Sequence, residues 1–172
     1  MKSYCFYDSD ESGYVDCELV GEEHQQLIKT CCKYCTTMAF VFTGPDQLGQ
    51  FQAELAPYEI LPPTAIGEDD YPLGFSKIFR FQADGSLHRW SSHTKFYRVC
   101  PELCVLLLSI TDSLFSWLDG WGFCNPENPT FYRSDGSVFF SSVIHEGVCT
   151  LNVRDDEDAS EIIRNPLWIE KK

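Results

Sequence analysis

The sequence predicts an α+β fold, in which a mainly antiparallel sheet built from hairpins carries about three helices. Asp84-Gly85 and Asp135-Gly136 each separate two apolar runs, which predicts β-hairpins because glycine accepts the positive φ of a tight turn. Apolar residues recur at helical spacing in residues 22–35 and 101–118. No regular strand–helix–strand series is visible, which favours antiparallel pairing over a doubly wound sheet. The length predicts a single domain, residues 1–172.

The first predicted elements are two short strands, residues 3–7 and 14–20, which form a hairpin around the polar turn at 8–13. Residues 22–35 are predicted to be a helix with one apolar stripe. Two glutamates occupy its first turn, where the helix dipole favours anions.

Residues 36–43 are rich in Thr, Phe and Val and are predicted to be a buried strand. A short helix follows. Thr43 is its expected N-cap, Leu55 faces the core, and the helix ends before Pro57.

The second half of the chain contributes two more hairpins. Residues 75–82 and 86–99 flank the first Asp-Gly turn, and residues 139–143 and 148–153 form the last hairpin. Between them, residues 101–118 are predicted to be the central and most buried helix, because they are apolar over a wide arc.

The C-terminal segment begins with a charged connector at 155–158. One helical turn is expected at 159–164, ended by Pro166, and Trp168 is expected to pack back onto the body of the domain.

The chain carries 26 acidic and 13 basic residues, a formal net charge of −13. This excess opposes binding to nucleic acid and to anionic membrane surfaces, whose attraction depends on Lys and Arg. It would speed the encounter with a basic protein. The alternative is that the acidity is only the general property of many bacterial cytosolic proteins.

Two further features predict a cytoplasmic location. The first residues include Asp8, Asp10 and Glu11 and contain no apolar segment, so no secretory signal is expected. The nine cysteines are odd in number and scattered, which indicates reduced thiols.

Residues 8–16 resemble the calcium loop of EF-hand proteins. Oxygen-bearing side chains occupy loop positions one, three, five and nine, namely Asp8, Asp10, Ser12 and Asp16. Gly13 stands at the sharp turn, but position twelve, where a bidentate Glu is expected, is Leu19. We interpret the stretch as an acidic hairpin turn and retain a calcium site as the alternative.

Cysteines offer a possible zinc site. Cys32 and Cys35 have the two-residue gap of zinc ligands, and Cys100 and Cys104 supply a second pair. The first pair lies on the apolar stripe of a predicted helix, however, where a free thiol behaves as a small hydrophobic group. Core packing is therefore the favoured interpretation, and no cofactor is predicted.

His145, Glu146 and Cys149 are the candidate catalytic residues. A histidine beside an acid can act as a general base, and a nearby cysteine can act as its nucleophile. Gly147 is expected to turn the chain between them, so a polar hairpin turn is the favoured interpretation.

Two loops supply candidate partner-binding residues. Trp121 and Phe123 lie in the glycine- and proline-rich stretch 120–129, and Asp69 and Asp70 lie in the acidic loop 57–72. Exposed aromatic residues on an acidic surface are typical of protein-binding patches. The alternative is that the first loop folds back and buries its aromatic residues.

Together these features favour a non-catalytic module that binds, and for example neutralises, a basic protein, as an immunity protein does. A small enzyme with a Cys/His or carboxylate site is the first alternative, and a calcium- or zinc-binding module is the second. No oligomeric state is predicted.

Overall fold

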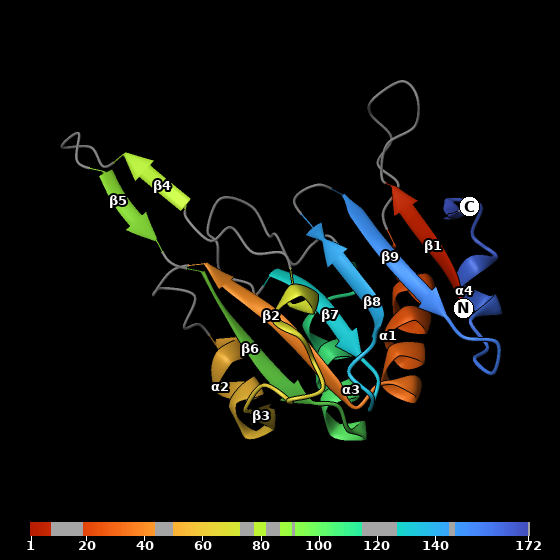
Figure 1. Cartoon of the computed structure of the whole chain (residues 1–172), viewed down its shortest axis with the longest axis horizontal. Helices are drawn as coiled ribbons and strands as arrows, with labels where there is room; N and C mark the ends of the chain where they lie inside the picture. The colour runs from red at the N-terminus through yellow and green to blue at the C-terminus, as the bar shows by residue number, and fades with distance from the viewer. Residues whose placement is uncertain are drawn as a thin grey trace.

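A computed structural model describes residues 1–7, 19–43, 50–72, 78–81, 87–90, 92–114, 127–144 and 147–171. Within these ranges the chain forms an eight-stranded antiparallel sheet, a two-stranded sheet and four helices (Figure 1). The predicted α+β character is therefore confirmed. None of the described helices combines the length and the apolar character needed to cross a membrane.

All described pairs of neighbouring strands in the large sheet are antiparallel. Their order across the sheet is β10 (Trp168–Glu170), β1 (Lys2–Tyr7), β9 (Val148–Val153), β8 (Val138–Val143), β7 (Glu127–Tyr132), β2 (Thr37–Thr43), β6 (Ser92–Arg98) and β3 (Glu59–Ile60). The small sheet pairs β4 (Ile78–Phe81) with β5 (Leu87–Trp90). The helices are α1 (Glu22–Tyr34), α2 (Gln50–Leu55), α3 (Pro101–Ile110) and α4 (Ser160–Ile163).

Strand β1 does not form the predicted hairpin with residues 14–20. It lies between β9 and β10, and its register with β9 runs from Lys2 to Tyr7. Val20, at the end of the second predicted strand, bridges to Ser113 instead. The prediction was wrong because it assumed pairing between sequence neighbours, whereas β1 is paired by strands from the opposite end of the chain. Residues 8–18 lie outside the described part.

Helices α1 and α3 lie against one face of the large sheet (Figure 1). Apolar side chains with no exposed surface fill the space between these helices and the strands; they include Phe6, Leu27, Cys31, Phe40, Leu103, Leu107, Phe131, Phe140 and Leu151. The stripe predicted for residues 22–35 is therefore the core-facing side of α1.

Helix α3 is shorter and less buried than predicted. It ends at Ile110, and Val105 on its outer side is 68% exposed. The helix stops because the backbone turns toward the segment before α1. Thr111 is extended, and the amide of Leu114 donates to the carbonyl of Leu19 at 3.0 Å. Residues 115–118 of the predicted helix lie outside the described part.

The Asp-Gly hairpins are confirmed where the structure describes them. Strands β7 and β8 join through Gly136, whose φ is +84°. A Cβ atom at this position would collide with the backbone carbonyl of Ala65, so glycine both makes the turn and lets the neighbouring loop approach. Strands β4 and β5 form the other hairpin. The predicted strand 86–99 is divided, since β5 and β6 belong to different sheets.

The C-terminal predictions are also confirmed. Helix α4 is a single short turn that ends before Pro166. Trp168 is buried on β10, and its ring lies 5.4 Å from that of Phe6.

The described residues cover the other face of the large sheet only in part. The loop between β3 and β4 crosses it near β2 and β7 (Figure 1) and forms a second small core. Ile66 and Tyr71 of this loop pack there on Phe96 and Tyr132, with the rings of Tyr71 and Phe96 4.9 Å apart. The neighbouring part of the face carries small side chains that are only half-buried, such as Ser141 and Thr150.

Candidate functional site

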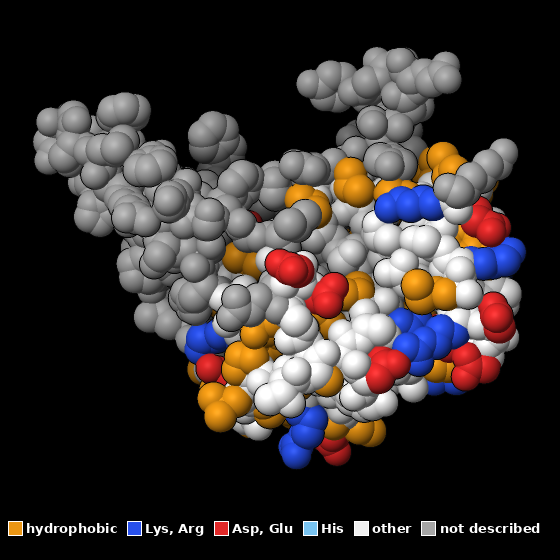
Figure 2. Space-filling view, viewed as in Figure 1, with side chains coloured by type: hydrophobic (Ala, Val, Ile, Leu, Met, Phe, Trp, Pro, Cys, Tyr) orange, Lys and Arg blue, Asp and Glu red, His pale blue; other side chains and the backbone are white. Residues whose placement is uncertain are grey.

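A hollow of about 280 Å³ lies where the loop between β3 and β4 meets strands β7 and β8. The loop side is formed by Asp69, Asp70, Tyr71 and Pro72. The sheet side is formed by Thr130, Val138, Ser141, Ser142 and Val143. Acidic side chains are visible on the partly covered face, beside uncharged ones (Figure 2). The hollow is thus acidic on one side and lined by hydroxyl and small apolar groups on the other.

The fold holds the acidic side of the hollow in place. The hydroxyl of Tyr132 donates to the backbone carbonyl of Asp70 at 2.8 Å, and the amide of Asp70 donates to the carbonyl of Gly67 at 3.0 Å. Ile66 and Tyr71 fix the loop on either side through the second core. The backbone that carries the two carboxylates is therefore held by hydrogen bonds and by apolar packing.

None of the described residues that line the hollow is basic. Asp69 and Asp70 are exposed, and neither forms an ion pair with another described residue. Burial, followed by the charge of Asp70, raises the pKa of the Tyr132 hydroxyl, so this phenol stays protonated and remains a donor. Within the described part of the chain, the negative charge of the pair is therefore not neutralised by an ion pair.

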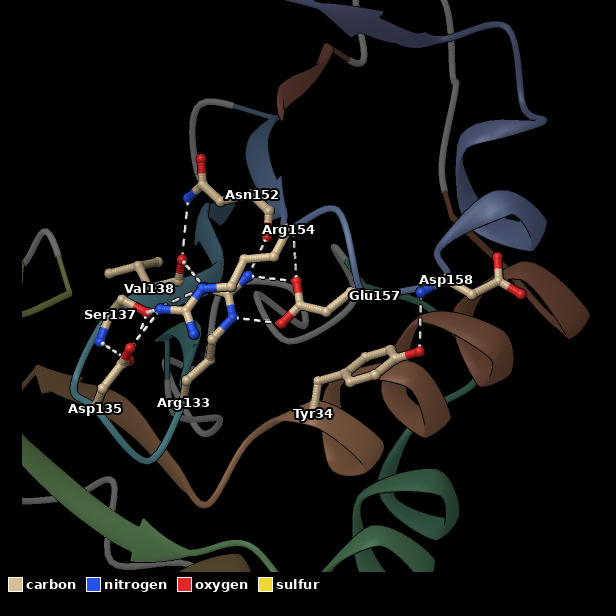
Figure 3. A network of polar contacts seen from close by, with 9 residues as sticks. All are labelled: Tyr34, Arg133, Asp135, Ser137, Val138, Asn152, Arg154, Glu157 and Asp158. Atoms are coloured by element: carbon tan, nitrogen blue, oxygen red, sulfur yellow. Dashed lines mark hydrogen bonds and ion pairs between the residues drawn. The ribbon is translucent and has the colours of Figure 1, made fainter. Parts of the chain in front are cut away.

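A second acidic group near β8 is arranged in the opposite way (Figure 3). Glu157 and Arg133 are 6% and 4% exposed, and they form a two-bonded ion pair with N–O distances of 2.5 and 2.7 Å. The amide of Arg154 also donates to Glu157 at 2.7 Å. The guanidinium carbon lies 5.1 Å from the ring centre of Phe139.

The remaining donors of Arg133 are satisfied by neighbouring strands. Its Nη2 donates to the carbonyl of Asn152 at 2.6 Å, and its Nη1 donates to the carbonyl of Val138 at 3.0 Å and to Ser137 Oγ at 3.2 Å. Burial alone would raise the pKa of Glu157, but the hydrogen bonds from Arg133 and the backbone outweigh it, so the pKa lies below its ordinary value. All five N–H donors of Arg133 are thus paired, and the network ties the β7–β8 turn to the connector before α4.

Figure 3 also shows how the network continues toward the surface. Asp135 accepts from the amide and hydroxyl of Ser137 and pairs with Arg154. This ion pair, followed by the hydrogen bonds from Ser137, lowers the pKa of Asp135. On the other side, the amide of Asp158 donates to the Tyr34 hydroxyl of α1 at 2.9 Å.

Of the three predicted catalytic residues, only Cys149 lies within the described part of the chain. This cysteine is 1% exposed on β9, and burial raises the pKa of its thiol well above the ordinary value, with a further contribution from Cys5. Its thiolate is therefore scarce at neutral pH, although a thiolate is the nucleophilic form. His145 and Glu146 lie outside the described part.

Two other predicted groups cannot be placed from the described residues. The calcium-loop residues Asp8, Asp10, Ser12 and Asp16 lie outside it, and so do the loop aromatics Trp121 and Phe123. Of the predicted partner-binding residues, Asp69 and Asp70 are described, and they lie together at the hollow.

Cys32 lies on α1 and Cys104 on α3, and these helices pack against each other; Cys35 directly follows α1 and Cys100 directly precedes α3. Cys31 and Cys35 are buried in the core, while Cys32, Cys100 and Cys104 lie at its margin. Within the described ranges, no group of three or more His, Cys, Asp or Glu side chains is arranged to hold a metal ion.

Two buried polar groups were not identified from the sequence. Glu157 lies in the charged run 155–158, and nothing in its neighbours distinguishes it as a buried partner of Arg133. His24 lies on the buried side of α1 with 0% exposure, and neither ring nitrogen has a hydrogen-bond partner among the described residues. Burial lowers the pKa of His24 to about 4, against the opposing charge of Asp112.

Comparison with known proteins adds no assignment. No protein-family model, no curated protein and no solved structure matches this chain. The geometry and charge of the described residues show a hollow with two acidic residues, Asp69 and Asp70, in its lining.

Proposed function

We propose that this chain is a non-catalytic protein-binding module whose acidic hollow receives a basic side chain of a partner, in the way that an immunity protein neutralises a cationic enzyme. The observation that carries the proposal is the pair of exposed carboxylates, Asp69 and Asp70, beside a hollow whose described lining residues include no basic one. A lysine or arginine entering the hollow would meet these carboxylates and the hydroxyl of Ser141.

The charge of the whole chain supports the same function. With a net charge of −13, the surface attracts a basic protein over a distance and raises the rate of encounter. Local complementarity at the hollow then selects the orientation of the partner. Salt screens this long-range attraction, so the rate at which the complex forms should fall as the salt concentration rises.

The enzyme alternative has less support. Its Cys/His form relies on Cys149 as the nucleophile, and this thiol is buried and has a raised pKa. An activated catalytic cysteine needs the reverse arrangement, partial exposure and a lowered pKa.

A pulldown with matched variants tests the binding function. The bait is the tagged chain, the source is a lysate of the cells that naturally produce it, and retained proteins are identified by mass spectrometry at low and high salt. Recovery of one basic protein, weakened by salt, is expected. The purified partner is then titrated against Asp69→Asn/Asp70→Asn, whose affinity should fall about tenfold or more, equivalent to about 1.4 kcal/mol.

The control is Asp155→Asn/Asp156→Asn, which removes the same charge from another exposed acidic pair. Its affinity should stay within about threefold of the wild type, because only long-range attraction changes. Equal losses in both variants would mean that the partner responds to net charge and does not use the hollow. Recovery of no basic protein would reject the proposed function.

A further inference from the structure

Besides its apolar packing, the loop that carries the acidic pair is attached to the β7–β8 hairpin at two points of its backbone. On β7, the hydroxyl of Tyr132 donates to the carbonyl of Asp70 at 2.8 Å. At the turn, the absence of a side chain on Gly136 leaves room for the carbonyl of Ala65, which a Cβ atom there would overlap. The two points lie on either side of Ile66, which packs in the second core.

Tyr132 contributes to the attachment in two ways that can be separated. Its ring is fully buried in the second core, 6.2 Å from the ring of Phe96. Its hydroxyl holds the backbone of Asp70, so phenylalanine at this position would keep the ring and remove only the hydrogen bond. Tyr97 of β6 offers a matched control, because it is equally buried and its hydroxyl has no hydrogen-bond partner among the described residues.

We propose that Tyr132 and Gly136 are positioning residues for the acidic hollow, which hold its loop in the arrangement that receives a basic side chain and thereby set the affinity. The inference rests on the proposed binding function and deepens it. Neither residue is among those that line the hollow, so both act through the backbone that carries Asp69 and Asp70. A loop that is already ordered loses little conformational freedom on binding, whereas a released loop has to be ordered by the ligand, which lowers the affinity.

Tyr132→Phe tests the hydrogen bond alone. Its affinity for an arginine-rich peptide should fall about three- to tenfold, which is the range expected for the loss of one neutral hydrogen bond. Tyr97→Phe should stay within about twofold of the wild type, because it removes a buried hydroxyl without removing a hydrogen bond to the loop.

Gly136→Ala tests the close approach of the loop to the turn. Its loss of affinity should exceed that of Tyr132→Phe, because the added Cβ atom displaces the backbone at Ala65. A side chain also strains the turn, since the φ of Gly136 is +84°. Gly21→Ala controls for this strain: Gly21 has a φ of +57°, but a Cβ atom there meets nothing within 4 Å. Gly21→Ala should therefore retain the affinity.

The experiment uses the complete chain and titrates the wild type and each variant with the same arginine-rich peptide at physiological salt. Amide hydrogen exchange of the free proteins then reports whether the loop has been released. The amides of Ile66 and Asp70 each donate to a backbone carbonyl of the same loop at 3.0 Å. In Tyr132→Phe they should exchange faster relative to the amides of β1 and β9, whereas a general loss of stability would accelerate both groups alike.

The outcomes separate the positioning role from the binding function. Lower affinity in Tyr132→Phe and Gly136→Ala, with both control variants close to the wild type, would support the proposal. Binding by the wild type that is unchanged in Tyr132→Phe, or is weakened equally in Tyr97→Phe, would overturn the positioning role and leave the binding function standing. A wild-type chain that does not bind the peptide would reject the binding function and the positioning role with it.

Discussion

Two acidic regions adjoin the β7–β8 hairpin, and they differ in whether the chain itself supplies the cation. Glu157 is buried and forms two bonds with Arg133, whereas Asp69 and Asp70 are exposed without an ion pair to a described residue. Val138 belongs to both regions, since its carbonyl accepts from Arg133 and the residue also lines the hollow. The same strand thus borders a completed network and an open acidic site.

The difference follows from the cost of burying charge. An unpaired buried carboxylate costs several kcal/mol, so Glu157 requires an internal partner. Exposed carboxylates are solvated and incur little cost without one. The fold therefore does not need a cation beside Asp69 and Asp70, and a partner can provide it. Substitution of Glu157 should therefore lower the stability of the fold, whereas substitution of Asp69 and Asp70 should lower the affinity for a partner.

Glu157→Gln should cause the largest loss of stability. It leaves the guanidinium of Arg133 buried without a counter-charge, and breaking a buried ion pair costs about 3 to 5 kcal/mol. Urea unfolding at pH 7, followed by circular dichroism, measures the change in the free energy of unfolding. The control is Asp156→Asn, which is exposed and should change it by less than about 0.5 kcal/mol. Equal effects of the two substitutions would contradict a structural role for the network.

His24 differs from Glu157 in that it is buried without a hydrogen-bond partner among the described residues. The unfolded chain takes up its proton near the ordinary pKa of about 6.5, whereas the folded chain does so only near pH 4. The unfolded state therefore binds more protons between these values, and stability falls as the pH is lowered. The contribution of His24 to this fall is roughly 3 kcal/mol.

His24→Leu removes this contribution. Urea unfolding of both proteins in steps from pH 7 to pH 4 should give curves that diverge in favour of the variant as the pH falls. The remaining carboxylates titrate in both proteins and cancel in the difference. Parallel curves would mean that His24 does not bind its proton at a lowered pKa in the folded chain.

Asp135→Asn should have a smaller effect than Glu157→Gln. Its ion pair with Arg154 is exposed to solvent, where salt and water screen the attraction. The lowered pKa of Asp135 means that its contribution is present above the unfolded pKa and is lost as the pH falls. The effect should shrink further when unfolding is measured in added sodium chloride, while that of Glu157→Gln should persist. A larger loss for Asp135→Asn than for Glu157→Gln would reverse the ranking.

Asp69→Asn/Asp70→Asn should have the smallest effect on stability. Neither carboxylate forms an ion pair with a described residue, and the backbone bonds that hold the loop are retained. The free energy of unfolding should change by less than about 0.5 kcal/mol, as is usual at exposed positions. Urea unfolding at pH 7 tests this. A loss comparable to that of Glu157→Gln would show that the pair serves the fold and would remove the contrast between the two regions.

The features that could be predicted from the sequence are the local ones. Asp135-Gly136 makes its turn with neighbours one to three residues away, so turn chemistry was sufficient to predict the β7–β8 hairpin. The apolar stripe of α1 could be predicted in the same way, because apolar residues recur every three or four positions in residues 22–35. Asp69 and Asp70 lie in a stretch rich in proline and charge, which predicts a surface loop, and both are exposed.

The features that were missed depend on contacts between distant parts of the chain. The partners of β1 come from the C-terminal strands, and the end of α3 is fixed by a bridge to Val20. Arg133 and Glu157 are charged residues in polar stretches, where a local pattern predicts exposure. Only the closing of the β7–β8 turn over the connector before α4 places them together in the interior.

The central claim is that the acidic hollow, and not the acidic surface in general, binds a basic partner. It is tested most directly by recording amide chemical shifts of the isotopically labelled chain during titration with an arginine-rich peptide at physiological salt. The largest shifts should occur at Asp69, Asp70, Thr130 and Ser141, and they should be absent in Asp69→Asn/Asp70→Asn but present in Asp155→Asn/Asp156→Asn. Shifts spread over all acidic surfaces, or centred on the connector at 155–158, would contradict the claim.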